Sequence, residues 1–314
     1  MAGIPLFSAR QVELAVSPDR AVDAVREAFV HYARGEWTMP PKVYVPVYPD
    51  GDFRAMPALG GGHALLKWVT SFPGNPLQGL PTVMGLVLVS DASNGTLKAM
   101  LDAGAVTALR TGAAAVLAAE TLAREDGGAA AVIGAGVNGR ATARTFLARG
   151  RDVLLWDVNE ERAQRAATEL GCGVASSRDE ALAADVVVTV TPGSEVLFPQ
   201  GSLRPGQHAS LMGADGPGKA EIASEELARV RVFCDDWGQA SHNGDLAHAV
   251  EAGVLRRDAV TELGAVLAGD APGRSGDDET TVFDSTGLAI QDLAIALAAL
   301  EQMNETSGLA RIDL

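Results

Sequence analysis

The chain has 314 residues, of which 47% are hydrophobic and 21% are charged, and its formal net charge is -15 at pH 7. This composition fits a globular protein with two lobes or one large α/β domain, and it excludes a disordered chain, a collagen-like repeat and a coiled coil. An acidic surface repels phosphate groups, so we do not expect nucleic acid among the partners.

The sequence shows no sign of export or of a membrane. No uninterrupted apolar run approaches the roughly 20 residues of a spanning helix, and the start of the chain lacks the basic and apolar segments of a signal peptide. The two cysteines, Cys172 and Cys234, form neither a disulfide framework nor a metal cluster. We therefore expect a cytoplasmic protein without a membrane partner and without a bound metal.

The first part of the chain predicts a helix followed by a mostly antiparallel sheet. Ser17 and Pro18 suit the start of a helix, and Gly35 suits its end. Asp50 and Gly51 form a hairpin turn signal. Alternating or apolar strand patterns occupy residues 43–47, 64–71, 83–90 and 96–101.

An alanine-rich helical pattern covers residues 104–124, and Gly127 with Gly128 then marks a domain boundary. After this boundary, short apolar runs alternate with helical patterns, which is typical of a parallel sheet covered on both faces. The apolar runs begin near residues 129, 153, 185 and 208. A polar loop at 268–281 precedes a last amphipathic helix at about 286–303.

Gly134, Gly136 and Gly139 form the pattern G-x-G-x-x-G between a predicted strand and a predicted helix. The first glycine would make the tight turn, the second would let the backbone approach a pyrophosphate, and the third would let the helix pack closely. The free N–H groups at the start of the helix favour phosphate binding. Asp157 ends the next strand, where an acid binds the adenosine ribose and repels a 2′-phosphate. This pattern indicates NAD, and Arg162 nearby keeps NADP as an alternative.

Three charged residues stand out as candidates for a substrate site. Lys67 lies in an apolar strand and Arg110 lies in a helix of small residues, where a buried cation needs an anionic partner. Asp215 follows a strand of the second part, and the carboxyl ends of parallel strands face the ligand crevice of such sheets. The structural alternatives are a Lys67 that reaches solvent at a rim, an Arg110 paired with Glu120 or Asp102, and an Asp215 that caps a turn.

Several blocks of the sequence, in the right order, resemble the ornithine cyclodeaminase/μ-crystallin family over nearly the whole chain. They are MPPK (39–42), LLKWV (65–69), residues 79–101, TALRTGAAA (107–115), IGAGVNG (133–139), GADGPGKAE (213–221) and FDSTGLAIQDLA (283–294). They are most similar to the branch that contains archaeal-type alanine dehydrogenases and ketimine reductases. The resemblance implies a Rossmann-type doubly wound parallel sheet in residues 127–287. It also implies a smaller α+β substrate-binding and dimerisation lobe, formed by residues 1–126 with 288–314, and a homodimer.

The resemblance also implies roles for individual residues. Lys67 and Asp215 would be catalytic, the first polarising a carbonyl or imine and the second acting as general acid/base. Lys42, Lys67 and Arg110 would bind substrate, although Lys42 replaces a family arginine and lacks its bidentate fork. The positions that match the lining of the cofactor site are Thr82, Arg110, Thr111, Gly134, Gly136, Val137, Asn138, Gly139, Asp157, Thr191, Lys219 and Ser285.

Two neighbouring features refine this interpretation. Arg54 stands where cyclodeaminases tend to have a glutamate, and an arginine facing the site would repel the second ammonium of ornithine. A substrate with a small or uncharged side chain is therefore favoured. Trp68 should face away from Lys67, because successive strand residues point to opposite faces, so we expect it to pack in the dimer lobe.

The leading interpretation is an NAD-dependent oxidoreductase acting on the Cα–N bond of a small amino acid, as in an alanine dehydrogenase that joins pyruvate and ammonia with NADH. Arg110 would hold the carboxylate, Lys67 would stabilise charge on the carbonyl oxygen, and Asp215 would move protons. The alternatives are a cyclic ketimine reductase acting on pyrroline-2-carboxylate, an ornithine cyclodeaminase-type ammonia lyase, and a non-catalytic, crystallin-like protein that binds NAD(P).

Overall fold

The computed structural model of the protein describes residues 3–193, 195–214, 216 and 218–313. The chain divides into two compact units: unit 1 comprises Met1–Arg110 and Leu288–Leu314, and unit 2 comprises Thr111–Gly287. The division lies within helix α3 (Ala103–Leu122), whereas the sequence signal for a boundary, Gly127–Gly128, comes after that helix. The domain limits drawn from the sequence stay a prediction.

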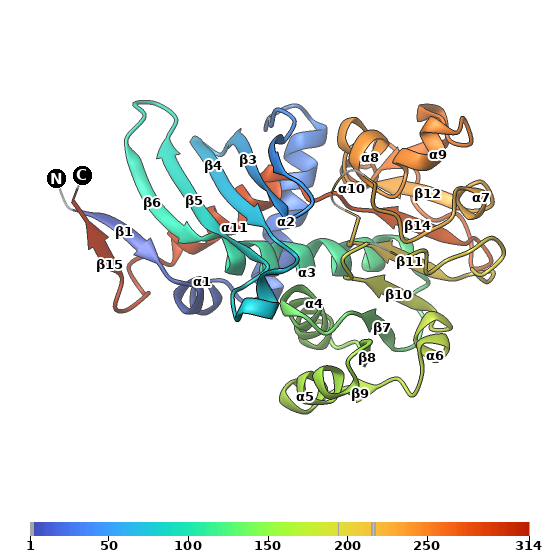
Figure 1. Ribbon diagram of the computed structural model, residues 1–314. Helices are drawn as coiled ribbons and strands as arrows, with labels where there is room; N and C mark the ends of the chain where they lie inside the picture. The colour runs from blue at the N-terminus through green and yellow to red at the C-terminus, as the bar shows by residue number, and fades with distance from the viewer. Residues whose placement is uncertain (1–2, 194, 215, 217, 314) are drawn as a thin grey trace. The chain divides into compact units, whose positions relative to one another are not determined.

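Unit 1 is built on one mixed sheet of seven strands in the order β15-β1-β6-β5-β4-β3-β2 (Figure 1). The strands are β1 (Ile4–Phe7), β2 (Val43–Val47), β3 (Gly51–Gly60), β4 (His63–Ser71), β5 (Val83–Asp91), β6 (Leu97–Asp102) and β15 (Ala310–Ile312). All neighbouring strands are antiparallel except β1 and β6. The run from β2 to β6 confirms the predicted sheet. The short strands β1 and β15 were not predicted, because so few residues carry too little pattern.

Unit 1 also contains helical segments, and the last of them packs on the face of the sheet where Lys67 lies. They are α1 (Ala9–Ala15), α2 (Pro18–Ala33), the 3₁₀ turn η1 (Asn75–Gln78) and α11 (Ala289–Glu301), together with the start of α3. Ser17 caps α2 by accepting a hydrogen bond from the Arg20 amide, as its position predicts. Helix α11 contacts α2 and strands β3, β4 and β5, and almost all of its residues are buried. An apolar helix of this kind belongs to a core.

Helix α3 is long and apolar enough to cross a membrane by length and composition. Within the described part of the chain it is the one helix with this property, and 83% of the apolar stretch is buried inside the protein. Its small residues allow close packing, as the sequence suggests: a Cβ on Gly112 would lie 3.0 Å from the Ala141 oxygen of α4 (Val137–Ala148). The core of a folded protein therefore accounts for this helix.

Unit 2 is built on a sheet of eight strands in the order β13-β12-β14-β11-β10-β7-β8-β9, and every neighbouring pair is parallel (Figure 1). The strands are β7 (Ala130–Ile133), β8 (Val153–Trp156), β9 (Gly173–Val174), β10 (Val186–Thr189), β11 (His208–Leu211), β12 (Arg231–Cys234), β13 (Val260–Glu262) and β14 (Thr281–Asp284). The helices besides α4 are α5 (Glu160–Leu170), α6 (Arg178–Leu182), α7 (Ser224–Leu227), α8 (Trp237–Asn243), α9 (Ala247–Glu251), η2 (Arg257–Ala259) and α10 (Leu263–Ala268).

The order of this sheet confirms the predicted fold class, a doubly wound parallel sheet joined to a smaller α+β unit. From β7 the chain proceeds outward to β8 and β9, and then returns to form β10 on the other side of β7. Such a reversal of strand order is the place where α/β sheets bind ligands, at the carboxyl ends of the strands. The glycine loop follows β7 directly, so it lies at this point.

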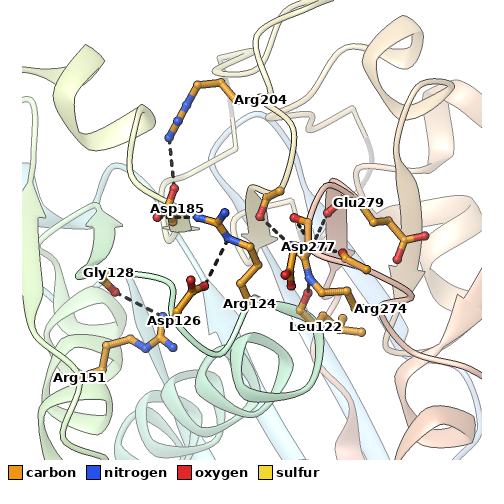
Figure 2. A network of polar contacts seen from close by, with 12 residues as sticks. Leu122, Arg124, Asp126, Gly128, Arg151, Asp185, Arg204, Arg274, Asp277 and Glu279 are labelled. Atoms are coloured by element: carbon orange, nitrogen blue, oxygen red, sulfur yellow. Dashed lines mark hydrogen bonds and ion pairs between the residues drawn. The ribbon is translucent and has the colours of Figure 1, made fainter.

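A polar network connects the segments at the amino ends of the strands in the same sheet (Figure 2). Arg274, from the polar loop predicted at 268–281, donates to the Leu122 oxygen at 2.9 Å and to the Gly206 oxygen at 2.6 Å. Arg124, just after α3, lies 3.0 Å from Asp185, which precedes β10. Because these residues precede β10 and β11 or follow α3, the network closes the amino ends of the strands and leaves the carboxyl ends for a ligand.

Candidate active site

The glycine loop of unit 2 is closed on one side and open on the other. Gly134 has a φ of +106°, and a Cβ there would lie 2.7 Å from the Val190 oxygen, so only glycine fits this turn. A Cβ on Gly139 would lie 1.7 Å from the Gly134 oxygen, so this glycine lets α4 pack against the loop. Nothing lies within 4 Å of a Cβ built on Gly136. The open side is therefore at the glycine expected to face a pyrophosphate.

Helix α4 begins directly after this loop. Gly136 is its N-cap without a side-chain hydrogen bond, and the first helical bond runs from the Arg140 amide to the Gly136 oxygen. Helix geometry leaves the amides of Val137, Asn138 and Gly139 without an intrahelical acceptor, and the Val137 side chain is largely exposed. These donors and the positive end of the helix dipole suit a phosphate group.

Asp157 lies immediately after β8 and beside the glycine loop. Its Oδ2 accepts a hydrogen bond from the Ala135 amide at 2.8 Å, and its Oδ1 accepts one from the Asn159 amide at 2.8 Å. Arg162 Nε is 3.8 Å from Oδ1, on a side chain that is half exposed. The fixed carboxylate can accept from ribose hydroxyls and opposes a 2′-phosphate. The loop, the helix start and this acid together fit NAD.

Thr191 and Lys219, two predicted cofactor positions, lie around a buried acid that the sequence analysis missed. Glu221 accepts hydrogen bonds from Thr191 Oγ1 at 2.5 Å, from Thr189 Oγ1 at 2.6 Å and from the Gly213 amide at 3.1 Å. Burial raises the pKa of Glu221, and these hydrogen bonds and the Lys219 charge offset part of the rise. Glu221 therefore fixes the loops that follow β10 and β11.

Further buried carboxyl groups lie at the carboxyl ends of β12 and β14. Ser285, another predicted cofactor position, donates to Asp235 Oδ2 at 3.1 Å. Burial raises the pKa values of Asp245 and Asp284 far above the usual range, and the charge of Asp245 adds to the rise at Asp284. Among the described residues, no group of three or more His, Cys, Asp or Glu side chains is arranged to hold a metal ion. Burial therefore favours the neutral form of Asp245 and Asp284, whereas Asp235 serves as the acceptor for Ser285.

In unit 1 the two predicted cations meet at a carboxylate that the sequence analysis missed. Lys67 Nζ donates to Asp292 Oδ1 at 2.9 Å, and Arg110 Nε lies 3.7 Å from the same oxygen. The side chains of Lys67 and Asp292 are 2% and 0% exposed, and that of Arg110 is 13% exposed. Lys67 is therefore buried rather than extended to a rim, and the ion-pair partner of Arg110 is Asp292. An acid inside an apolar helix was the available signal for Asp292.

Burial and three charged neighbours act in opposite directions on the pKa of Lys67. Burial and the charges of Arg110 and Arg54 lower the pKa of its ammonium, the Asp292 carboxylate raises it, and the net pKa is about 8. At neutral pH the amine is mostly protonated, yet it lies close to its titration range. A group in this state can donate a hydrogen bond or a proton to a bound substrate.

Arg54 is buried in unit 1 with an acid of its own. Its Nε donates to Asp52 Oδ1 at 2.6 Å, and its Nη2 donates to Asp52 Oδ2 at 3.1 Å. Its guanidinium lies 5.4 Å from the centre of the Tyr44 ring. Asp52 offsets the charge of Arg54, so the repulsion that we expect toward a diamino substrate is weaker than that of an isolated arginine.

The remaining predicted positions are placed as follows. Lys42 is half-buried just before β2, and Thr82 is half-buried just before β5, where its carbonyl accepts from the Phe72 amide at 2.8 Å. Thr111, the first residue of unit 2, is buried, and within the described part of the chain its hydroxyl has no hydrogen-bond partner. Asp215, the predicted general acid/base, lies outside the described residues. The roles assigned to all of these residues stay predictions.

Trp68 lies on the face of β4 opposite to Lys67, as strand alternation predicts. Its side chain is 43% exposed and its ring stacks on Phe53 with 5.7 Å between ring centres. Exposed apolar side chains surround it on strands β2, β4 and β5 and define, with Trp68, the outer apolar face: Val43, Val45, Leu66, Met84 and Leu86. A contiguous exposed apolar patch of this kind is typical of a surface that binds another molecule.

Three comparisons relate the chain to known proteins. The model of the ornithine cyclodeaminase/mu-crystallin family matches residues 6–307. The alanine dehydrogenase of Archaeoglobus fulgidus is 41% identical over 305 residues, which are 94% of this chain and 94% of that protein. A solved archaeal alanine dehydrogenase dimer with bound NAD has a TM-score of 0.92 at 39% identity and covers 99% of each chain.

A second solved structure is that of Thermococcus litoralis Δ1-pyrroline-2-carboxylate reductase in complex with NADH and L-proline. It has a TM-score of 0.91 at 27% identity, and the match covers 98% of this chain and 100% of that one. The chain therefore belongs to the ornithine cyclodeaminase/mu-crystallin family.

Proposed function

We propose that the protein is an NAD-dependent oxidoreductase that acts on the Cα–N bond of a small α-amino acid, as an alanine dehydrogenase does. In the aminating direction, pyruvate, ammonium, NADH and one proton give alanine, NAD⁺ and water. The 41% identical alanine dehydrogenase and the NAD-bound archaeal structure support this activity and this cofactor. The observation that carries the proposal is the pair of cations, Lys67 and Arg110, held at one buried carboxylate.

The charges of this cluster favour a substrate with one carboxylate. Lys67 and Arg110 carry two positive charges against the one negative charge of Asp292, and Arg54 and Asp52 offset each other. One positive charge is therefore left over, and a buried charge is costly until a counter-ion pairs with it. The carboxylate of pyruvate or alanine supplies one negative charge, whereas a dicarboxylate brings a second one.

Each group then has a chemical task. Arg110 holds the substrate carboxylate, and Lys67 donates to the carbonyl or imine and stabilises negative charge that develops there. The glycine loop and Asp157 hold NAD, which when bound accepts or donates the hydride. Asp215, whose role rests on the resemblance of its motif, activates water and exchanges protons with the substrate.

NADH oxidation followed at 340 nm tests the proposal. We expect turnover with pyruvate only when ammonium is present. Oxaloacetate with ammonium should show a kcat/KM about tenfold or more below that of pyruvate, because its second carboxylate finds no free charge in the cluster. Equal rates for the two keto acids would contradict the charge argument.

The same assay separates the alternatives. The likeness to the T. litoralis reductase favours a cyclic imine as second candidate substrate. Turnover of pyrroline-2-carboxylate without ammonium, and none with pyruvate, would replace the proposed reaction by imine reduction. Release of ammonia from ornithine without net NADH would indicate a cyclodeaminase. NAD binding without turnover of any substrate would indicate a crystallin-like binding protein.

A homodimer formed through the outer apolar face belongs to the same proposal. Trp68 and its neighbours on β2, β4 and β5 present an apolar surface on one face of the sheet. Lys67 and the helix α11 that it contacts lie on the opposite face. The archaeal relative described above is a dimer. A second copy of this chain is therefore the partner that we expect on this face, and small amino acids, keto acids or imines are the expected ligands.

A further inference from the structure

We propose that Asp292 is a positioning residue: it fixes the direction of the Lys67 ammonium and keeps Lys67 charged beside Arg110, so that a substrate carboxylate completes the cluster. The inference rests on the proposed function, because it is that function which assigns Lys67 and Arg110 to the substrate. Lys67 and Asp292 are 225 positions apart in the chain.

One oxygen atom of Asp292 joins three elements of unit 1. Asp292 lies in the first turn of α11 and is fully buried. Its Oδ1 accepts from Lys67 Nζ of β4 at 2.9 Å and lies 3.7 Å from Arg110 Nε of α3. The positive end of the α11 dipole favours a negative charge at this place. The carboxylate is therefore held where it can orient both cations.

The arrangement leaves donors for a ligand. A lysine ammonium has three N–H donors, and Asp292 takes one of them. Arg110 Nε is buried, and the described residues provide it with no hydrogen-bond partner. A buried donor without a partner is costly, so these N–H groups are the ones that a bound carboxylate or carbonyl would satisfy.

Asp292 is also the group that keeps Lys67 charged. The charged groups that act on Lys67 are Asp292 from α11, Arg110 from α3 and Arg54 from β3, the last with Asp52 beside it. Burial and the two arginines lower the pKa of Lys67, Asp292 raises it, and the net value is about 8. Without the Asp292 charge the pKa would fall further, and Lys67 would be neutral at the pH at which it should act.

Enzyme kinetics test this role first. Asp292→Asn keeps the size of the side chain and an acceptor but removes the charge. We expect the alkaline limb of the kcat/KM profile to move down by about 1–2 pH units, which lowers kcat/KM at pH 8 about fivefold or more. The activity relative to wild type should recover as the pH falls toward 6, because Lys67 is then protonated again. A defect of folding alone would not recover in this way.

Two further variants act as controls. Asp292→Glu restores the charge and should bring the alkaline limb back toward that of the wild type. Glu226→Gln removes a carboxylate of unit 2 that is 1% exposed and accepts from the Gly201 and Leu203 amides at 2.5 and 2.8 Å. This control should lower stability, because the Gly201 and Leu203 amides lose their charged acceptor, without moving the limb.

A second readout needs no substrate. The chain has only four lysines: Lys42, Lys67, Lys98 and Lys219. In protein labelled with ¹⁵N-lysine, the Nζ signal that is missing in Lys67→Met identifies Lys67, and its titration gives the pKa directly. We expect the midpoint to fall by about one pH unit or more in Asp292→Asn and to stay unchanged in Glu226→Gln.

An equal Lys67 midpoint in wild type and Asp292→Asn would overturn the inference, and so would a midpoint that moves while the pH profile of activity stays. The NMR titration uses the free protein. It therefore decides for or against Asp292 even if no tested substrate turns over, an outcome that would count against the proposed reaction alone.

Discussion

We expect the Asp157 carboxylate to serve two tasks. It holds the glycine loop through the Ala135 amide, and its charge lies where the ribose of a dinucleotide is expected. We expect Asp157→Ser to lower the ratio of kcat/KM for NADH to that for NADPH by about tenfold or more, because serine still accepts a hydrogen bond but no longer repels a 2′-phosphate. Steady-state kinetics with both cofactors measure the ratio. An unchanged preference would show that another group selects the cofactor.

His208 makes the free energy of unfolding depend on pH in the acidic range. The ring is buried between Thr281 Oγ1 and Ser210 Oγ, both at 2.9 Å, and burial, with the charges of Arg274 and Arg151, lowers its pKa from 6.5 to about 3. Between about pH 6.5 and pH 3, His208 is therefore protonated in the unfolded chain and neutral in the folded chain. The stability contribution is present above pH 6.5 and is lost toward pH 3, by about 1.4 kcal/mol per pH unit.

Urea denaturation between pH 4 and pH 7 measures this effect. We expect His208→Gln to be less stable than the wild type at pH 7 by about 1 kcal/mol, because it weakens two buried hydrogen bonds. Its free energy of unfolding should fall less steeply toward pH 4 than that of the wild type. Parallel slopes for the two proteins would show that His208 is not the group that titrates.

Single residues were predictable from the sequence where their chemistry conflicts with their surroundings. Lys67 and Arg110 stood out because a cation in an apolar strand or helix needs a partner, and both are indeed buried beside one. The partner itself was missed, because a separation of 225 positions is bridged only by the folded chain. The same holds for Glu221, whose neighbours Thr189 and Thr191 reach it from another strand.

At the scale of elements, the carboxyl ends of β11, β12 and β14 collect buried acids. Asp284 ends β14, its Oδ2 accepts from the Leu246 amide at 3.3 Å, and burial together with Asp245 and Asp235 raises its pKa far above the usual range. A carboxyl group that folding keeps neutral contributes stability at low pH, and this contribution is lost as the pH rises through the folded pKa.

We therefore expect Asp284→Asn, which cannot ionise, to gain stability relative to the wild type as the pH rises. The difference between the two free energies of unfolding should grow by about 1 kcal/mol or more from pH 6 to pH 9. Urea titrations at the two pH values measure it, with Glu226→Gln as the control that should show no such growth. A constant difference would mean that Asp284 is ionised in the folded protein.

Elements with a strong local pattern were predicted well, and those placed by the tertiary structure were not. The glycine loop, α2 and the strands from β2 to β8 follow from periodicity and turn residues. Strand β14 lies between β11 and β12, although β12 and β13 come before it in the chain. No local signal encodes this insertion, because the partners of β14 are distant in the sequence.

At the scale of the whole molecule, we expect the outer apolar face of unit 1 to bind a second copy of the chain. Trp68, stacked on Phe53, lies in its middle. We expect Trp68→Ala to raise the dissociation constant of the dimer about tenfold or more, because a large aromatic anchor carries much of the energy of an interface. The KM for pyruvate should change less than about twofold, since Trp68 faces away from Lys67.

Sedimentation equilibrium and steady-state kinetics on the same samples measure the two effects. Leu14→Ala is a matched control, because Leu14 lies on α1, is 71% exposed and is not part of the outer apolar face. A large change in KM with an intact dimer would place Trp68 at the substrate instead. Equal effects of Trp68→Ala and Leu14→Ala on the dimer would place the interface elsewhere.

The pairing of β1 with β15 has a consequence for how the chain is made. Residues 1–110 leave the ribosome before unit 2, whereas α11 and β15, which complete their unit, leave after it. At a synthesis rate of about 5–20 residues per second, the half-finished sheet waits roughly 10–40 s while unit 2 emerges. During that time its apolar inner face and the Lys67 ammonium have no α11 to cover them. The uncovered apolar face is therefore open to aggregation for as long as unit 2 is being made.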